Sequence, residues 1–279
     1  MQREFDITEN EMLEALKKSG YLLESEISRI LVESGFFIES NQVIEDPFTG
    51  KSREIDLMAE YHFYKKNRTN YQAASIIKFV FEIKNNLFPI VLLSKWEFSP
   101  NIEDWIGLKE ALTIPNDLIN LKYDWTESYY NQLILNNEKI FTQYCSFQKK
   151  KANDDLMALH PDHIHEGLSK ITQVCEEMVK LWDKELLYDS PNKKENFFRH
   201  FLFMPILLIN DELYELNDNK LNKVESSILV FNYYFNKESK MAYIFIVTKQ
   251  GFPNFIKQMV KLENDVEEKM IKMKNNTQQ

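Results

Sequence analysis

A single strand-like run constrains the fold of this 279-residue chain more than any other feature. Residues 76–86 (IIKFVFEIKNN) are rich in aromatic and β-branched side chains and too short for an ordinary helix, which predicts a strand inside a sheet. Glu82 and Lys84 lie two positions apart near its end and therefore point to the same face. Such charges are costly there unless they are paired or bind a metal. The alternative is a strand that simply ends here, with Lys84 in solvent.

Composition narrows the class of protein. A hydrophobic content of 44% is typical of a globular chain. The longest apolar run, residues 201–209, is too short to span a bilayer, and Pro205 interrupts it. The first residues lack a signal pattern, and Cys145 and Cys175 make neither a disulfide framework nor a zinc site, so we expect a reduced cytoplasmic protein without a membrane partner. The net charge of −9 does not indicate nucleic-acid binding, although a local basic patch would be enough for such binding.

The periodicity of apolar residues predicts a mixed α/β chain with a helical middle. Thr8 and Glu11 predict a capping box at the first helix, and Gly20 ends it. We expect an N-terminal part of the core at 1–98, a helical insertion at 99–190, and C-terminal strands and a helix at 191–279 that complete the same domain. Helices are expected at 9–18, 21–34, 102–112, 128–144, 162–187 and 255–274, and strands at 36–45, 51–60, 76–86, 88–93, 201–210, 213–216, 224–235 and 241–247.

Acidic residues of the N-terminal third form a candidate site with Lys84. Asp56 and Glu82 lie on strands that we expect to be neighbours, and either Glu24 or Glu26 could join them from the second helix, because the helical wheel does not choose between the two. Converging carboxylates repel each other unless a cation lies between them. Oxygen ligands suit Mg²⁺ or Mn²⁺, which can polarise a phosphoryl oxygen and acidify a bound water. With Lys84 holding the water or stabilising the developing charge, such a site could hydrolyse phosphodiesters.

The same residues carry a family resemblance. Four segments in this order, LESEI at 23–27, ESGF at 33–36, DPFTGKSREIDLMA at 46–59 and FEIK at 81–84, resemble the PD-(D/E)XK nuclease superfamily, which has the restriction-endonuclease-like fold. The joint pattern is far more specific than its parts. Two features depart from the family: the stretch between Asp56 and Glu82 is longer than in compact members, and Asp56 does not follow a proline.

The resemblance implies a restriction-endonuclease-like mixed β-sheet core flanked by helices. It implies that Asp56, Glu82 and Glu24 bind Mg²⁺ or Mn²⁺ together with the main-chain carbonyl of Ile83, and that Lys84 is the catalytic lysine. The implied activity is that of a metal-dependent endonuclease acting on DNA, with RNA as the alternative substrate.

A non-catalytic binding or assembly subunit with the same fold is the rival interpretation, motivated by the acidic net charge and the expected insertion. A third expectation combines the two: a nuclease that works only as a homodimer or with a partner protein, for example in anti-phage defence. That expectation rests on analogy alone.

Two further groups of residues are weaker candidates. His163 and His165 would open the predicted helix at 162–187, where residues two apart do not face each other, so a helix start is favoured over a zinc site. Tyr233 and Tyr234 could stack on bases, but packing in the interior is the commoner fate of such residues.

Overall fold

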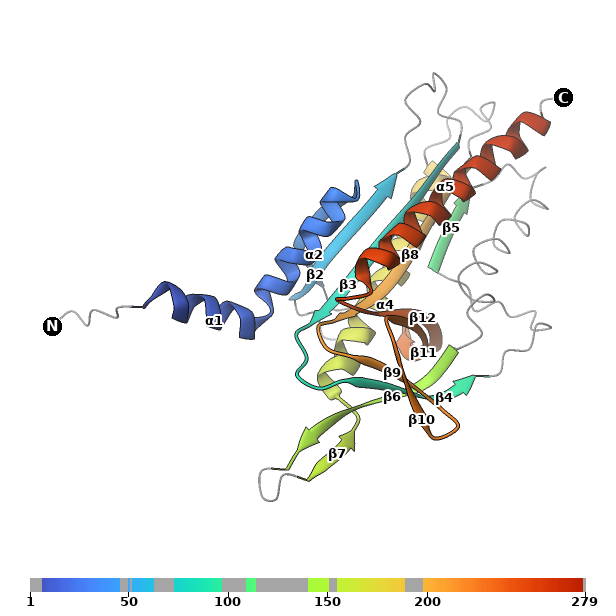
Figure 1. Ribbon diagram of the computed structural model, residues 1–279. Coiled ribbons are helices and arrows are strands. Elements are labelled where there is room, and N and C mark those ends of the chain that lie inside the picture. Colours follow the sequence, from blue (N-terminus) through green and yellow to red (C-terminus); the bar gives the residue numbers. More distant parts are fainter. Residues whose placement is uncertain are drawn as a thin grey trace.

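A long mixed β-sheet organises the computed structural model, which describes residues 7–45, 50, 52–62, 73–96, 109–113, 140–150, 155–188 and 198–277. Within these ranges the sheet has 12 strands and the chain has four helices, three of which, α2, α4 and α5, pack on the sheet (Figure 1). The predicted α/β class with a mixed sheet is therefore confirmed. Residues 46–49, which belong to the quoted motif, lie outside the described residues.

Two helices open the described chain as predicted. Helix α1 (Glu9–Ser19) begins with the expected capping box, in which the Thr8 hydroxyl accepts from the Glu11 amide and the Glu11 carboxylate accepts from the Thr8 amide. Gly20 ends it with a φ of 92°, a conformation that glycine adopts without strain. Helix α1 extends away from the sheet (Figure 1), whereas α2 (Tyr21–Glu33) packs on it through the buried residues Leu23, Ile27 and Leu31.

The next strands form one half of the sheet. Strands β1 (Phe37–Glu45), β2 (Ser52–His62) and β3 (Ala73–Lys84) pair antiparallel in chain order. Strand β8 (Phe198–Ile209) then pairs parallel with the whole of β3. Parallel neighbours need a crossover connection, and helix α4 (Asp162–Tyr188) lies on that connection and packs against both strands.

The other half of the sheet continues from β8 through β12, β11, β6, β4, β9 and β10. Strands β5 and β7 branch from this path, β5 beside β8 and β7 beside β6. The predicted hairpin between β11 and β12 is confirmed, with positive φ at Asn236 and Lys237. The bounds are β4 (Ile90–Trp96), β5 (Lys109–Thr113), β6 (Ile140–Lys149), β7 (Leu156–Leu159), β9 (Leu213–Asn217), β10 (Lys220–Val224), β11 (Ser226–Phe235), β12 (Glu238–Thr248) and the closing helix α5 (Phe252–Thr277).

Both faces of the central strands are buried, and alternate residues of β3 supply the two layers of the core. Phe79 and Phe81 pack in the layer that α2 and α5 cover. Val80 packs in the layer that α4 covers, beside Leu168 and Ile171 of that helix. Because Glu82 and Lys84 continue the alternation of Val80, both side chains project toward α4. Burial on both faces explains why this part of the sequence is almost continuously apolar.

Two of the predicted helices are wrong where the structure describes them. Residues 109–112 belong to strand β5 and residues 140–144 to strand β6; the remainder of both predicted helices, at 102–108 and 128–139, lies outside the described residues. In β6 the buried residues Ile140, Phe141 and Tyr144 imitate helical spacing, but pairing with both β4 and β11 decides the conformation. The helix predicted at 162–187 is confirmed as α4. The segment 99–190 therefore supplies strands of the common sheet as well as a helix, and the description of it as purely helical is wrong.

Candidate metal and catalytic site

Asp56 lies where strand β2 separates from β3. The pairing of the two strands ends at Leu57 with Phe81. At the adjacent residue, Asp56, a side-chain hydrogen bond to β3 replaces the main-chain pairing. Its Oδ2 accepts a hydrogen bond of 2.7 Å from the Ile83 amide. The contact fixes the Asp56 carboxylate at the end of β3, beside the next residue that projects toward α4, which is Glu82.

Glu82 and Lys84 form an ion pair on the face of β3 that α4 covers. Lys84 Nζ lies 2.5 Å from Glu82 Oε1. The Glu82 residue is only 3% exposed, while the Lys84 side chain keeps 26% of its surface in solvent. The sequence thus predicted correctly that these two charges share a face. The interpretation that Lys84 stands free in solvent is wrong.

Lys170 of helix α4 brings a second ammonium to the same carboxylates. Its Nζ lies 2.6 Å from Glu82 Oε2 and 3.6 Å from Asp56 Oδ1. It also donates a hydrogen bond of 2.8 Å to the main-chain carbonyl of Glu54. Sequence reasoning missed this residue, because its place beside Asp56 depends on how α4 crosses the sheet.

One oxygen of the cluster lacks a hydrogen bond. Glu82 Oε2 is buried and accepts none, although Lys170 Nζ is within ion-pair distance of it. The Lys170 ammonium directs a hydrogen bond to Glu54 instead, and its attraction to Oε2 is electrostatic. Glu82 Oε2 therefore has the Lys170 ammonium as its partner, and a ligand could reach this oxygen only if Lys170 moved.

Gly167 lets helix α4 approach Glu82. A Cβ atom at this position would lie 2.6 Å from both Cδ and Oε1 of Glu82, far inside contact distance. A glycine inside a helix costs about 1 kcal/mol relative to alanine, so its presence calls for such a reason. Gly167 and Lys170 are three residues apart and lie on neighbouring parts of one helix surface. Together they make α4 the cover of the carboxylates.

Glu24 faces this cluster from helix α2, whereas Glu26 does not. The pKa of Glu24 is raised by burial and then by the charges of Asp56, Glu54 and Glu82. Glu26 instead pairs with Lys249 at 2.7 Å. The structure thus separates the two glutamates that the helical wheel left open. Glu24 interacts with Asp56 and Glu82 through its charge and lies at the margin of the cluster.

The carboxylates of Asp56 and Glu82 are close enough to disturb each other. The pKa of Asp56 is raised, first by burial and second by the negative charge of Glu82. The hydrogen bond from the Ile83 amide and the charges of Lys170 and Lys84 oppose that rise without cancelling it. An additional positive charge between the two acids would stabilise their ionised forms.

The donors suit a hard divalent cation in chemistry and number. In the described ranges no group of three or more His, Cys, Asp or Glu residues is arranged to hold a metal. Mg²⁺, however, is commonly bound through one or two carboxylates, with water and substrate oxygens completing its shell. Asp56 and Glu82 are two such carboxylates, and one oxygen of each is already directed at the same cation, the Lys170 ammonium. They fit the metal provided that Lys170 moves. The ligand role of the Ile83 carbonyl stays a prediction.

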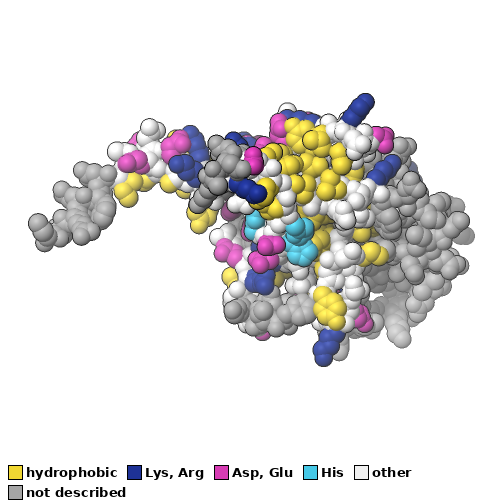
Figure 2. Space-filling model, turned by 90° about the horizontal axis from the view of Figure 1, so that it is seen from below, with side chains coloured by type: hydrophobic (Ala, Val, Ile, Leu, Met, Phe, Trp, Pro, Cys, Tyr) yellow, Lys and Arg dark blue, Asp and Glu magenta, His cyan; other side chains and the backbone are white. Residues whose placement is uncertain are grey.

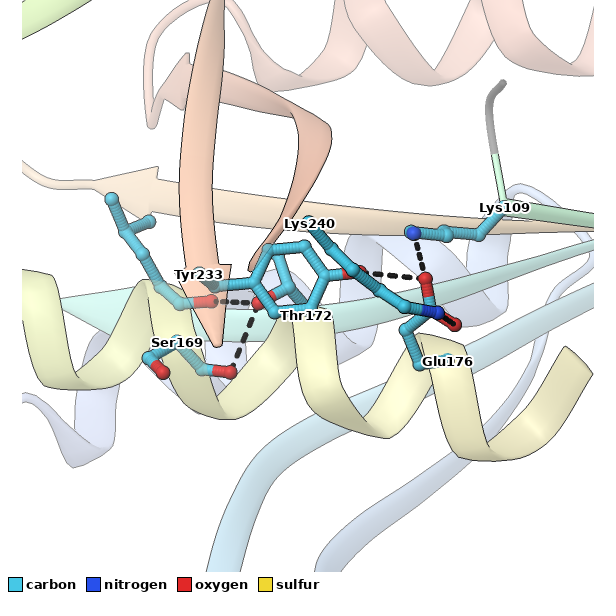
Figure 3. A network of polar contacts seen from close by, with 7 residues as sticks. Lys109, Ser169, Thr172, Glu176, Tyr233 and Lys240 are labelled. Atoms are coloured by element: carbon cyan, nitrogen blue, oxygen red, sulfur yellow. Dashed lines mark hydrogen bonds and ion pairs between the residues drawn. The ribbon is translucent and has the colours of Figure 1, made fainter. Parts of the chain in front are cut away.

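A second polar cluster lies two turns along α4 (Figure 3). Glu176 is buried between Lys109 of β5 and the hairpin β11–β12, where the Tyr233 hydroxyl donates to it at 2.6 Å and Lys240 at 3.2 Å. Burial alone would raise the pKa of Glu176, but hydrogen bonds from Lys109 and Tyr233 and the charges of both lysines lower it. Lys109, Tyr233 and Lys240, which come from three strands of the sheet, all contact Glu176, so the cluster anchors α4 to the sheet. Tyr233 is buried, as predicted, whereas Tyr234 is 54% exposed, so the prediction of interior packing is wrong for Tyr234.

Histidine side chains gather on the face shown in Figure 2, around the start of α4. The His160 ring packs against the rings of Tyr144 and His165 in tilted arrangements, with centroid distances of 4.9 and 5.1 Å. His163 is exposed in the first turn of α4. His163 and His165 therefore open a helix, as favoured from the sequence, and they belong to no metal-holding group among the described residues.

Comparisons with known proteins identify no relative of this chain. No protein-family model matches it, and no curated protein or solved structure matches it significantly. Among the described helices, none combines the length and apolar character needed to cross a membrane. The function is therefore argued from the geometry of the site.

Proposed function

We propose that this protein is a metal-dependent endonuclease of the PD-(D/E)XK type that hydrolyses phosphodiester bonds of DNA, with RNA as the alternative substrate. One observation carries the proposal: Asp56 and Glu82, from two adjacent strands, are directed at a single cation, with Lys84 paired to the same Glu82. The sequence pattern that resembles the superfamily implies this combination of two acids and one amine.

Asp56 and Glu82 would hold Mg²⁺ or Mn²⁺, with Glu24 at the margin adding negative charge. A metal held there supplies a Lewis acid that polarises a phosphoryl oxygen and acidifies a bound water. Asp56 is kept in place by the Ile83 amide, so the strand end itself orients this ligand. Lys84 is partly exposed, and its ammonium can hold the attacking water or stabilise the charge that develops on the phosphoryl group.

Cleavage of nucleic acid by the full chain tests this function. Supercoiled plasmid, single-stranded DNA and RNA are incubated with Mg²⁺ or Mn²⁺, and with EDTA. We expect metal-dependent cutting that falls by at least about 100-fold in Asp56→Asn and in Lys84→Ala, because each removes a group that stabilises the transition state. Glu26→Gln is the matched control, since Glu26 pairs with Lys249 outside the cluster.

Thermal unfolding must show that the inactive variants remain folded. Wild-type rates of cutting in both Asp56→Asn and Lys84→Ala would contradict the assigned roles. If wild type cut as fast in EDTA as in Mg²⁺ or Mn²⁺, the proposed dependence of cleavage on a metal would be contradicted.

A non-catalytic binding or assembly subunit is the second candidate, and the position of Lys170 favours it. Lys84 and Lys170 already balance the charges of Asp56 and Glu82, so the cluster is complete as a structural ion-pair network. Calorimetric titration with Mn²⁺ separates the candidates. Binding that Glu82→Gln abolishes supports the nuclease, while absence of binding to the wild-type chain and to Lys170 variants supports the subunit.

A further inference from the structure

Lys170 stands where the two acidic groups converge. Its ammonium contacts Glu82 Oε2 at 2.6 Å and Asp56 Oδ1 at 3.6 Å, and the Lys84 ammonium lies on the opposite oxygen of Glu82. A cation that used both carboxylates would need the space between Oε2 and Oδ1. Lys170 Nζ occupies that space in this structure.

Charge balance makes the two cations alternatives. Two carboxylates and two ammonium groups compensate one another in the cluster without a metal. A divalent ion between Asp56 and Glu82 would add two positive charges within a few ångströms of Lys170, at a site with little water to screen them. The metal and the Lys170 ammonium therefore compete for the same oxygens.

Displacing Lys170 requires a change in its side chain and not in the sheet. It is joined to the site through a flexible four-carbon stem rather than through the sheet, and its side chain is 12% exposed. Besides its ion pairs, Lys170 donates a hydrogen bond to the main-chain carbonyl of Glu54, a residue that is itself exposed, so the ammonium lies near the surface of the molecule. While it stays, it neutralises two acids that would otherwise repel each other across the end of β3.

We propose that Lys170 is the resident cation of the Asp56–Glu82 pair, a positioning residue that keeps the carboxylates assembled until a divalent metal displaces it. This inference rests on the proposed function for the identity of the competing ion, and it adds a control on metal occupancy that comes from α4. Metal affinity is then set by the cost of releasing Lys170 as well as by the ligands.

Mn²⁺ binding by the full-length wild type, Lys170→Met and Lys180→Met tests the proposal. Lys180→Met is the matched control, the same substitution on the same helix, at a lysine that packs over Phe235 instead of the carboxylates. Calorimetry measures the affinity for Mn²⁺, and thermal unfolding in EDTA and in Mn²⁺ measures how far the bound ion stabilises the folded chain. We expect Lys170→Met to unfold at a lower temperature than wild type in EDTA, to bind Mn²⁺ at least about tenfold more tightly, and to gain more from Mn²⁺. Lys180→Met should bind Mn²⁺ as wild type does, and Glu82→Gln added to Lys170→Met should remove the gain.

Equal or weaker Mn²⁺ binding by Lys170→Met, including no binding by any variant, overturns the inference. Failure of this inference can be told apart from failure of the nuclease proposal. Tighter binding by Lys170→Met with no cleavage by any form upholds the resident cation and overturns the nuclease. Metal-dependent cleavage by wild type, with unchanged Mn²⁺ affinity in Lys170→Met, upholds the nuclease and overturns the resident-cation role of Lys170.

Discussion

At the residue scale, the ionised side chain of Asp56 lowers the stability of the fold. Its pKa is raised by burial and by Glu82, which means that the folded chain holds the Asp56 proton more tightly than the unfolded chain does. Ionised Asp56 therefore destabilises the fold above its ordinary pKa of 3.8, and the penalty disappears as the pH falls through the raised pKa toward that value. Residues that are costly to the fold in this way are candidates for function.

Asp56→Asn should stabilise the fold at pH 7, although it removes a carboxylate on which the proposed nuclease activity depends. The asparagine oxygen can still accept from the Ile83 amide, and the buried negative charge is removed. The free energy of unfolding, measured with urea at pH 7 and near pH 4, should be higher in Asp56→Asn than in wild type at pH 7, with a smaller difference at the lower pH. Asp265→Asn on α5 is the control. A variant less stable than wild type at pH 7 would show that Asp56 serves the fold.

Gly167→Ala tests the close approach of α4 to Glu82. On an open helix surface this substitution would stabilise by about 1 kcal/mol. Here the added methyl group meets the Glu82 carboxylate at 2.6 Å, so we expect a net loss of about 1–3 kcal/mol in unfolding free energy. Combining it with Glu82→Ala should remove most of the loss, because the clash partner is gone. Stabilisation by Gly167→Ala alone would mean that α4 does not cover Glu82 so closely.

At the scale of elements, α4 connects the candidate site with the rest of the sheet. Gly167 and Lys170 meet the end of β3, and Glu176 ties the same helix to β5 and to the β11–β12 hairpin. The Glu176 cluster thereby sets where Lys170 lies along β3. A change at Glu176 should reach the carboxylates through the helix.

Glu176→Gln should destabilise the chain by about 2–3 kcal/mol, because it leaves Lys109 and Lys240 without their shared acid. The lowered pKa of Glu176 gives the pH dependence: its contribution is present above its ordinary value of 4.5 and is lost as the pH falls through the lower folded value. Urea unfolding from pH 7 downward should show the gap between wild type and variant closing only below pH 4.5. Glu166→Gln, at an exposed site on α4, should change little; equal stability of wild type and Glu176→Gln would contradict the anchoring role.

Elements with strong local signals were predictable, and elements that depend on distant partners were not. Helix α4 could be predicted because its apolar face and the proline before its start are local signals. The expected range of 162–187 differs from the observed helix by one residue at its end. Strand β5 has the sequence KEALT, whose residues favour helices, and it becomes a strand only by pairing with β8. Local propensity cannot anticipate a partner some 90 residues away, such as His200 for Glu110.

At the scale of the whole molecule, the candidate site is a product of sheet order. Asp56, Glu82 and Lys84 lie on strands that are neighbours in sequence, so their meeting could be predicted from alternation alone. Lys170 is more than 80 residues further on, and only the parallel pairing of β3 with β8 brings α4 over them. The one local hint was Gly167, an interior helix glycine in a chain with only six glycines, which signals that something approaches the helix closely.

The most direct test of the account is a crystal structure of the full chain with Mn²⁺, in which anomalous scattering locates the ion. We predict one Mn²⁺ within about 2.5 Å of carboxylate oxygens from both Asp56 and Glu82, with the Lys170 ammonium moved away from Glu82 Oε2. Crystals in which Lys170 still bridges the two carboxylates at saturating Mn²⁺, with no anomalous peak between them, would contradict a metal site there and the nuclease function built on it.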